Sequence, residues 1–198
     1  MIQLNALRCW IFDMDGTLTV PAHDFEAIRK AMGLASNEPI LEAIERMPAS
    51  EAKAAAEHLY ELEMDVAREA VAGEGVDALL SELKRRKIAV GIVTRNGFEI
   101  ARETLKACDL LKYFDSQFIM GREQAAPKPK PDGILQLLAS WQSRPEEAVM
   151  IGDYYYDLAA GKAAGTATVF LDIRGDGAWS DYADVTVKRL GDLLEFLQ

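Results

Sequence analysis

The sequence predicts an α/β fold in which a doubly wound parallel sheet carries a small, all-helical subdomain inserted after its first strand. Short apolar runs rich in strand-forming residues recur along the chain, and amphipathic helical patterns fill the gaps between them. The stretch from residue 20 to residue 74 differs, because it holds helical periodicity and no strand-like run. The length of 198 residues fits one domain with an insertion of this kind.

Each expected strand is an apolar run that stops at a polar or glycine-containing turn, where a buried strand cannot continue. These runs cover residues 7–12, 88–93, 116–120, 148–151 and 167–171. The expected helices outside the insertion cover residues 76–86, 98–108, 133–141, 157–164 and 190–197. Apolar strands that alternate with amphipathic helices indicate a Rossmann-like parallel sheet covered on both faces, and such sheets place their chemistry at the carboxyl ends of the strands.

The insertion splits the expected core into two pieces. We expect residues 1–19 and 75–198 to form the core, and residues 20–74 to form the helical subdomain. Pro21 marks the first boundary and a glycine-rich turn marks the second, since proline and glycine both interrupt regular structure.

The charge balance limits the partners of the chain. Its 32 acidic residues outnumber 22 basic ones and give a net charge of −10, which disfavours nucleic acid because a phosphate backbone needs a basic surface. An anionic substrate would need a local cation to offset this field. No apolar run approaches the roughly 20 residues that span a bilayer, so we expect no membrane partner. The two cysteines, Cys9 and Cys108, lie in apolar surroundings, which fits a reducing, cytoplasmic location without a disulfide scaffold.

The strongest chemical signal follows the first expected strand, in the run Asp13-Met14-Asp15-Gly16-Thr17. Two carboxylates one residue apart at a strand end can project to the same side, and Gly16 lets the backbone turn sharply. Crowded carboxylates repel one another, so we expect a cation between them, and oxygen ligands suit Mg²⁺. The competing interpretation is a polar turn in which the aspartates cap the next segment, and for an isolated Asp-x-Asp we would favour it.

A second signal is the pair Asp153 and Asp157, which follows another apolar strand. The two residues are one helical turn apart and share a face, so Asp153 can bind a metal while Asp157 orients the metal or its waters. The competing interpretation is helix N-capping by Asp153, with Asp157 simply favourable in the first turn. We expect the tyrosines between them, Tyr154, Tyr155 and Tyr156, to pack against the insertion or the core, with stacking on a substrate as the alternative.

Two further signals indicate anion binding. Thr94, Arg95 and Asn96 close the second expected strand and open a helix, where a hydroxyl and backbone amides form an anion cradle. We also expect Asn96 to be the N-cap of that helix. Lys128 lies between prolines in the run Pro-Lys-Pro-Lys-Pro, which stiffens the backbone and fixes where an ammonium points. An exposed proline-rich loop is the competing interpretation of that run.

Together these signals resemble the motifs of the haloacid dehalogenase superfamily, in particular its phosphoglycolate-phosphatase-like and β-phosphoglucomutase-like branch. The matching motifs, in the order in which that superfamily carries them, are Asp13-x-Asp15-Gly16-Thr17, Thr94, Lys128 and Gly152-Asp153-x-x-x-Asp157. The helical insertion falls where the superfamily has a helical cap, although it is short for this branch. The resemblance covers nearly the whole chain.

The resemblance implies a Mg²⁺-dependent phosphatase that acts on a small phosphorylated metabolite, such as phosphoglycolate, a sugar phosphate or a nucleotide-like compound. Asp13 would be the nucleophile that forms an aspartyl-phosphate, and Asp15 the general acid and base. The groups implied to hold Mg²⁺ are Asp13, the backbone carbonyl of Asp15 and Asp153, supported by Asp157. The groups implied to bind the phosphoryl oxygens are Thr94, Arg95 and Lys128.

Two other activities stay open from the sequence. The intact Asp13 and Asp15 pair also permits an intramolecular phosphomutase of the same fold, although a short cap excludes water poorly from such a site. A binding module with vestigial catalysis is disfavoured, because every catalytic residue type is present. Carbon chemistry is disfavoured as well, since haloacid dehalogenases lack a carboxylate at the position of Asp15. The sequence leaves the oligomeric state and the individual substrate open.

Overall fold

The computed structural model of the chain describes residues 3–21, 25–36 and 38–198. Its centre is a six-stranded parallel sheet with the strand order β3-β2-β1-β4-β5-β6. The strands are β1 (Cys9–Phe12), β2 (Ala89–Val93), β3 (Ile119–Met120), β4 (Ala148–Gly152), β5 (Ala167–Leu171) and β6 (Val185–Val187). The predicted doubly wound parallel sheet is therefore confirmed.

Strand β1 lies in the middle of this sheet and sets the position of the candidate site. Phe12 at its end pairs with Ile92 of β2 on one side and with Ile151 of β4 on the other. Because all three strands run in the same direction, the residues that follow them emerge at one edge of the sheet. Asp13, Thr94 and Asp153 are such residues.

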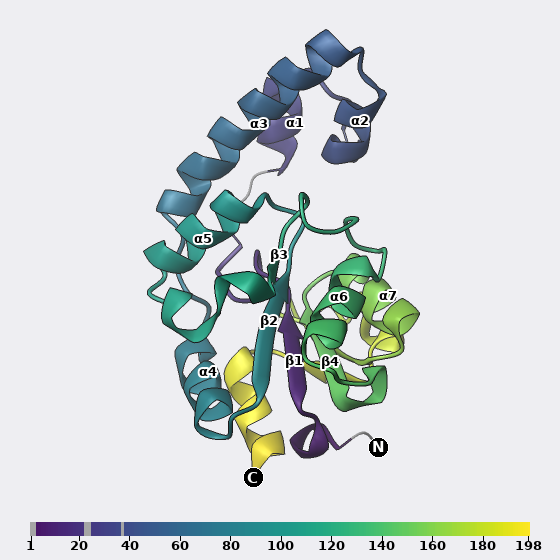
Figure 1. Ribbon diagram of the computed structural model, residues 1–198. Coiled ribbons are helices and arrows are strands. Elements are labelled where there is room, and N and C mark those ends of the chain that lie inside the picture. The colour runs from purple at the N-terminus through teal and green to yellow at the C-terminus, as the bar shows by residue number, and fades with distance from the viewer. Residues whose placement is uncertain (1–2, 22–24, 37) are drawn as a thin grey trace.

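Helices cover both faces of the sheet, as Figure 1 shows. Helices α4 (Val76–Arg85) and α5 (Phe98–Ala107) lie on one face, and α6 (Asp132–Ser140) and α7 (Tyr155–Ala164) lie on the other. The side chains of β1 alternate between the two layers, with Trp10 and Phe12 in one apolar core and Cys9 and Ile11 in the second. These fully buried layers fix the carboxyl end of β1 rigidly between its neighbours.

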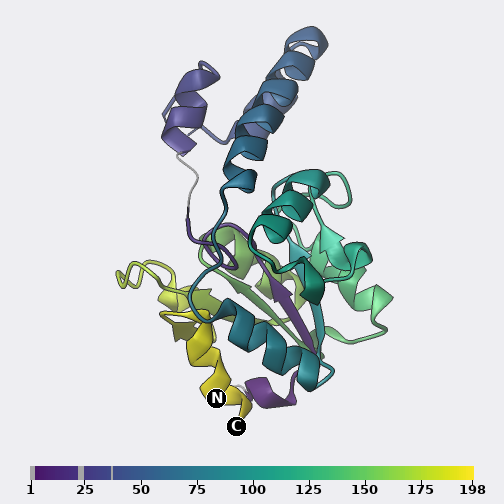
Figure 2. The same cartoon turned by 90° about the vertical axis from the view of Figure 1, so that its left-hand side faces the viewer.

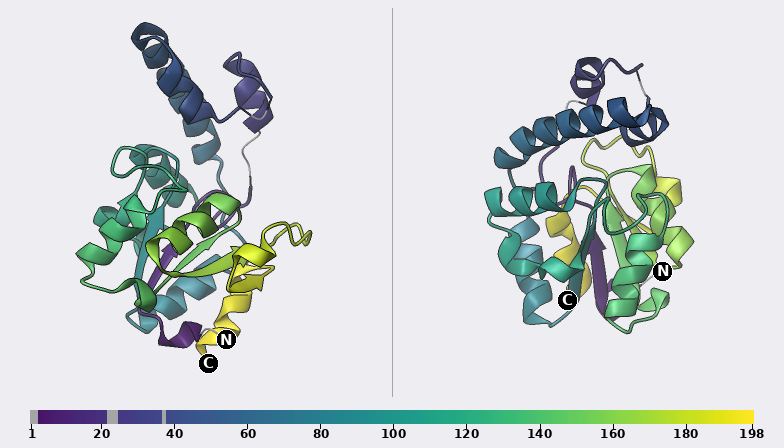
Figure 3. Two further views of the ribbon diagram at one scale, coloured as in Figure 1. Left: turned by 90° about the vertical axis from the view of Figure 1, so that its right-hand side faces the viewer. Right: turned by 45° about the horizontal axis from the view of Figure 1, so that its top comes forward.

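The segment between β1 and α4 is helical, as expected. It forms α1 (Phe25–Ala31), α2 (Ile40–Arg46) and the long α3 (Ala49–Arg68). Figures 1, 2 and 3 show these helices beyond the sheet edge at which the parallel strands end. The two connections to the core pair with each other, since the backbone amide of Val20 donates to Val71 at 2.9 Å and that of Gly73 donates to Leu18 at 2.9 Å.

Two predicted elements differ from the structure, and one strand of the structure is not among those predicted. Residues 116–118 form a 3₁₀ turn and only residues 119–120 are a strand, because the carboxylate of Asp115 accepts the amide of Gln117 at 3.1 Å and so stabilises a turn there. The closing helix over 190–197 is a 3₁₀ helix, η6. Strand β6 was not predicted, since three residues are too short to show a pattern. None of the described helices is long and apolar enough to cross a membrane.

Candidate active site

The turn after β1 places Asp13 at the sheet edge. Its backbone amide donates to Ile151 on β4 at 2.9 Å, and its side chain is buried. Gly16 has a φ of +81°, a conformation that favours glycine. A Cβ on Gly16 would also lie 2.4 Å from Oδ2 of Asp153, so only glycine lets the two loops approach this closely.

Three carboxylates meet at this edge. Asp13, Asp153 and Asp157 each offer an oxygen, and these atoms lie within 4.8 Å of one another. The β4–α7 turn is as tight as the first one, because a Cβ on Gly152 would lie 2.2 Å from Cγ of Asp157. A hydrogen bond fixes the side chain of Asp157, because one of its carboxylate oxygens accepts the backbone amide of Tyr154 at 3.1 Å. Three converging carboxylate oxygens are a donor set of the kind that binds a divalent cation.

Lys128 inserts its ammonium group into the carboxylate cluster. Its side chain is only 2% exposed, its Nζ donates to Oδ1 of Asp13, and the same nitrogen lies 2.6 Å from Oδ1 of Asp157. The interpretation of this run as a merely exposed loop is therefore wrong for Lys128, although it holds for Lys130, which is exposed. One buried lysine thus bridges two buried aspartates that lie far apart in the sequence.

The pKa values of the cluster indicate that one ammonium does not balance its three carboxylates. Burial and the neighbouring Asp13 and Asp157 raise the pKa of Asp153 to about 8. Burial also raises the pKa of Asp157 to about 6, against the opposing effect of Lys128. Burial lowers the pKa of Lys128, but Asp13 and Asp157 more than compensate and raise it above its usual value. Three carboxylates against one ammonium leave an excess of negative charge, so the residues present fit a bound Mg²⁺.

Asp15 has a different environment from the carboxylates of the cluster. The side-chain amide of Asn96 donates to its Oδ2 at 2.8 Å. Burial, followed by repulsion from Asp13, raises the pKa of Asp15 to about 7. A carboxyl group with such a pKa can both give and accept a proton near neutral pH.

The carboxyl end of β2 is built differently from the expectation. Thr94 is buried, and its hydroxyl accepts the backbone amide of Asn96 at 3.1 Å. The predicted N-cap role of Asn96 is wrong: Gly97 occupies that position, and the carboxylate of Glu123 accepts the amide of Phe98 at 2.9 Å. The side chain of Asn96 is therefore available for Asp15, and its place in the polar run Thr94-Arg95-Asn96 after a buried strand was the sequence signal for such a role.

Arg95 connects the site to the helical insertion. Its guanidinium donates to both carboxylate oxygens of Glu42 on α2, at 2.9 and 3.1 Å, and to the backbone carbonyl of Lys128. It also lies 5.0 Å from the centre of the Tyr156 ring. The role of Arg95 in phosphate binding stays a prediction, because in this arrangement its partner is a carboxylate of the insertion.

A second ion pair between insertion and core was not foreseen. Glu63 on α3 is 8% exposed and accepts a hydrogen bond from Arg122, which follows β3. The backbone amide of Arg122 donates to the carbonyl of Asn96 at 3.0 Å, so this pair lies next to the residue that holds Asp15. Neither charge has a local sequence feature that distinguishes it from ordinary surface charges.

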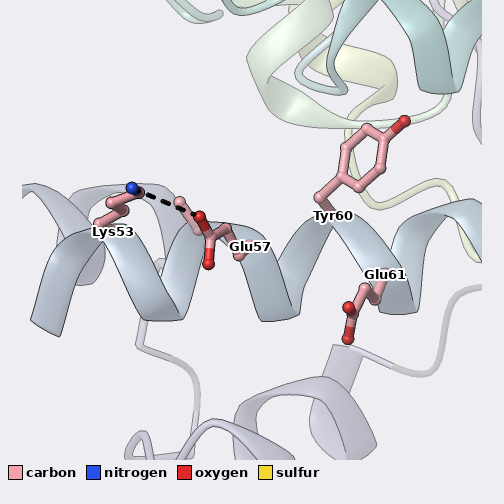
Figure 4. A pocket seen from close by; sticks show the side chains of 5 residues that line it. Lys53, Glu57, Tyr60 and Glu61 are labelled. Carbon is pink, nitrogen blue, oxygen red and sulfur yellow. Dashed lines mark ion pairs between the residues drawn. The ribbon is translucent and has the colours of Figure 1, made fainter.

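A surface hollow of about 470 Å³ lies away from this cluster, on α3. Figure 4 shows four of its lining side chains, Lys53, Glu57, Tyr60 and Glu61. Lys53 and Glu57 form an ion pair of 3.9 Å with both side chains largely exposed. No carboxylate of the cluster lines this hollow, so we do not assign a catalytic role to it.

Sequence comparisons place the chain among known hydrolases. The family model of haloacid dehalogenase-like hydrolases matches residues 10–171. An uncharacterised hydrolase from Saccharomyces cerevisiae is 30% identical over 202 residues, which cover 98% of this chain and 93% of that protein. The pyrophosphatase PpaX from Bacillus velezensis is 35% identical over 124 residues, which cover 61% of this chain and 57% of that protein.

Solved structures share the whole architecture. A hydrolase from Pseudomonas syringae superposes with a TM-score of 0.80 at 23% identity, covering 96% of this chain and 97% of that one. CbbY from Rhodobacter sphaeroides, solved in complex with phosphate, superposes with a TM-score of 0.71 at 22% identity, covering 96% of this chain and 99% of that one. At these identities the likeness shows the fold alone.

Proposed function

The chain belongs to the haloacid dehalogenase-like hydrolases, and from this premise we propose that it is a Mg²⁺-dependent phosphatase of small phosphorylated metabolites. The observation that carries the proposal is the convergence of Asp13, Lys128, Asp153 and Asp157, with Asp15 two residues from Asp13. The likeness in sequence to PpaX, a pyrophosphatase, supports phosphorus chemistry.

In the first proposed step Asp13 is the nucleophile. A carboxylate oxygen of Asp13 attacks phosphorus, the bond from phosphorus to the leaving oxygen breaks, and an aspartyl-phosphate forms. Lys128 and the hydroxyl and amide groups around Thr94 stabilise the charge of the transferring phosphoryl group. Asp15, with its pKa near neutrality, donates the proton that the leaving oxygen needs.

In the second proposed step water cleaves the aspartyl-phosphate. Asp15, now deprotonated, accepts a proton as the water oxygen attacks phosphorus. The bond between phosphorus and Asp13 then breaks, which releases phosphate and restores both carboxyl groups. Asn96 keeps Asp15 in place for both proton transfers through its hydrogen bond of 2.8 Å.

The proposed metal site uses Asp13, the backbone carbonyl of Asp15 and Asp153, with Asp157 in support. When bound, Mg²⁺ would neutralise phosphoryl charge and offset the excess of carboxylates in the cluster. This charge is what a protein of net charge −10 needs in order to accept an anionic substrate.

Release of phosphate from p-nitrophenyl phosphate tests the proposal. We expect turnover with Mg²⁺, loss of turnover with excess EDTA, and loss of turnover in Asp13→Asn. The matched control is Asp65→Asn on α3, whose side chain is 76% exposed, and it should keep wild-type activity. Inactivity of the wild type on this ester and on a panel of metabolites including pyrophosphate would refute the proposal, as would full activity of Asp13→Asn.

The same panel separates the two alternatives. Conversion of a labelled sugar phosphate into an isomer without free phosphate would identify a phosphomutase. Binding of beryllium fluoride at Asp13 without turnover of any substrate would identify a module with vestigial catalysis. We expect neither result.

A further inference from the structure

Five aromatic side chains gather beside the candidate active site. The aromatic cluster consists of Tyr154, Tyr155, Tyr156, Trp179 and Tyr182. Its first members follow Asp153 directly, and the others come from the loop between β5 and β6. Ring centres are separated by 5.1 Å for Tyr154 and Tyr156, 5.6 Å for Tyr154 and Trp179, and 5.1 Å for Tyr155 and Tyr182.

This cluster is not part of either apolar core. Tyr154 is 49% exposed and Tyr182 is 44% exposed, while the other three rings are half-buried. If these rings only anchored a loop, burial would increase their contribution to stability, because aromatic side chains stabilise folds mainly through the area they remove from water. Figures 2 and 3 show the loop that carries Trp179 projecting on the side of the molecule where α1 lies. The loop and α1 therefore lie toward the same side of the molecule in these views.

A series of side-chain contacts leads from the proposed phosphoryl site to the aromatic cluster. Arg95 donates to the backbone carbonyl of Lys128 and lies 5.0 Å from the ring centre of Tyr156. Tyr156 contacts Tyr154, and Tyr154 contacts Trp179. A substrate whose phosphate is held by Lys128 would thus have an aromatic surface nearby, and the exposed Tyr154 follows Asp153 directly in the chain.

We propose that the aromatic cluster binds the base of a nucleoside monophosphate, which names the substrate class of the proposed phosphatase and rests on that function. Aromatic side chains stack on the face of any nucleobase and contribute strongly to nucleotide affinity. In a nucleoside monophosphate the sugar separates the phosphate from the base, so one substrate can offer its phosphate to Lys128 and its base to rings outside the carboxylate cluster.

Matched substrates test the inference. Adenosine 5′-monophosphate and ribose 5-phosphate share the phosphate and the sugar and differ in the base. We expect kcat/KM for the nucleotide to exceed that for the sugar phosphate by about tenfold or more, which is the effect of one stacked base. Equal values for the two substrates, with both hydrolysed, would overturn the inference and leave the proposed phosphatase intact.

Variants assign the effect to the rings. Trp179→Leu and Tyr154→Leu should each lower kcat/KM for the nucleotide about tenfold while changing that for ribose 5-phosphate by no more than about twofold. Tyr154→Phe keeps the ring and should behave as wild type. Tyr60→Leu is the matched control, because Tyr60 is 47% exposed on α3 and lies outside the cluster. Equal losses on both substrates would show a structural role and contradict the inference.

Binding gives a readout that needs no turnover. In Asp13→Asn, titration with adenosine 5′-monophosphate should quench tryptophan fluorescence at concentrations at which ribose 5-phosphate does not. Trp179→Phe should remove this response, since Trp10 is fully buried and Trp141 packs against Phe118 at 5.3 Å between ring centres. Absence of quenching, or quenching that survives Trp179→Phe, would overturn the inference even if the chain hydrolyses no substrate at all.

Discussion

Nζ of Lys128 lies 2.6 Å from Oδ1 of Asp157, and both side chains are at most 3% exposed. The same nitrogen contacts Asp13, so one ammonium serves the proposed nucleophile and the carboxylate behind the proposed metal site. A pair buried this deeply is costly to desolvate and is a poor source of stability, which favours a functional reason for its presence.

Removal of the ammonium group should therefore affect catalysis strongly. We expect Lys128→Met to lower kcat on p-nitrophenyl phosphate by about 100-fold or more, because the charge on the phosphoryl group loses a fixed partner. Lys130→Met is the matched control, as Lys130 is an exposed lysine of the same loop and should be dispensable. Activity of Lys128→Met within about threefold of wild type would contradict the role proposed for Lys128.

Alanine variants of two glycines with similar backbone angles distinguish the effect of backbone strain from the effect of a changed metal site. Gly16 and Gly33 have φ values of +81° and +70°, but a Cβ on Gly16 would strike Asp153 whereas one on Gly33 would meet nothing within 4 Å. Both alanine variants should lose about 1 kcal/mol of unfolding free energy from the left-handed backbone. Only Gly16→Ala should also lose Mg²⁺ binding, measured by calorimetry. Equal Mg²⁺ affinity in the two variants would contradict the proposed metal site.

The stability of the metal-free protein should fall with rising pH. The pKa of Asp153 is raised from 3.8 to about 8 on folding, so the folded chain retains a proton that the unfolded chain has lost. Its contribution to stability is complete below the unfolded value and is lost as the pH approaches 8. Urea unfolding in EDTA between pH 5 and pH 9 measures this trend.

Metal binding should reverse that trend, because Mg²⁺ replaces the proton as the partner of the carboxylates. The rise in melting temperature on adding Mg²⁺ should thus be larger at pH 8 than at pH 6. Asp153→Asn should weaken both the pH dependence and the Mg²⁺ effect. If the free energy of unfolding of the metal-free protein increased across this pH range, the proposed repulsion among the carboxylates of the cluster would be contradicted.

The ion pair of Glu63 with Arg122 should hold α3 on the core. We expect Glu63→Gln to increase hydrogen–deuterium exchange in α3 and to raise KM, because the partly buried guanidinium of Arg122 loses its charged partner. Glu61→Gln, an exposed neighbour on the same helix, should leave exchange unchanged. Identical exchange in the two variants would mean that the pair does not fasten the insertion.

Much of the core was predictable because its signals are local. A run such as Ala148 to Ile151 is apolar throughout and ends in Gly-Asp, so strand and site residue are found together. The insertion was predictable for the same reason, since helical periodicity replaces strand patterns over residues 20–74. Its boundaries as a separate subdomain stay a prediction.

The remaining features depend on contacts between distant residues. Asn96 and Asp15 are 81 positions apart, and Arg95 and Glu42 are 53 apart. A single sequence contains no signal that pairs such residues, because each is also a common residue for a helix end or an exposed surface. The aromatic cluster is a similar case, since Trp179 contacts the tyrosines after Asp153 but lies far from them along the sequence.

A crystal structure with Mg²⁺ and beryllium fluoride tests the central claim most directly. We predict the fluoride mimic bonded to a carboxylate oxygen of Asp13 and contacted by Lys128, with Mg²⁺ held by Asp13, the carbonyl of Asp15 and Asp153. Binding of the mimic elsewhere, or a metal held by other residues with Asp13 unmodified, would contradict the account.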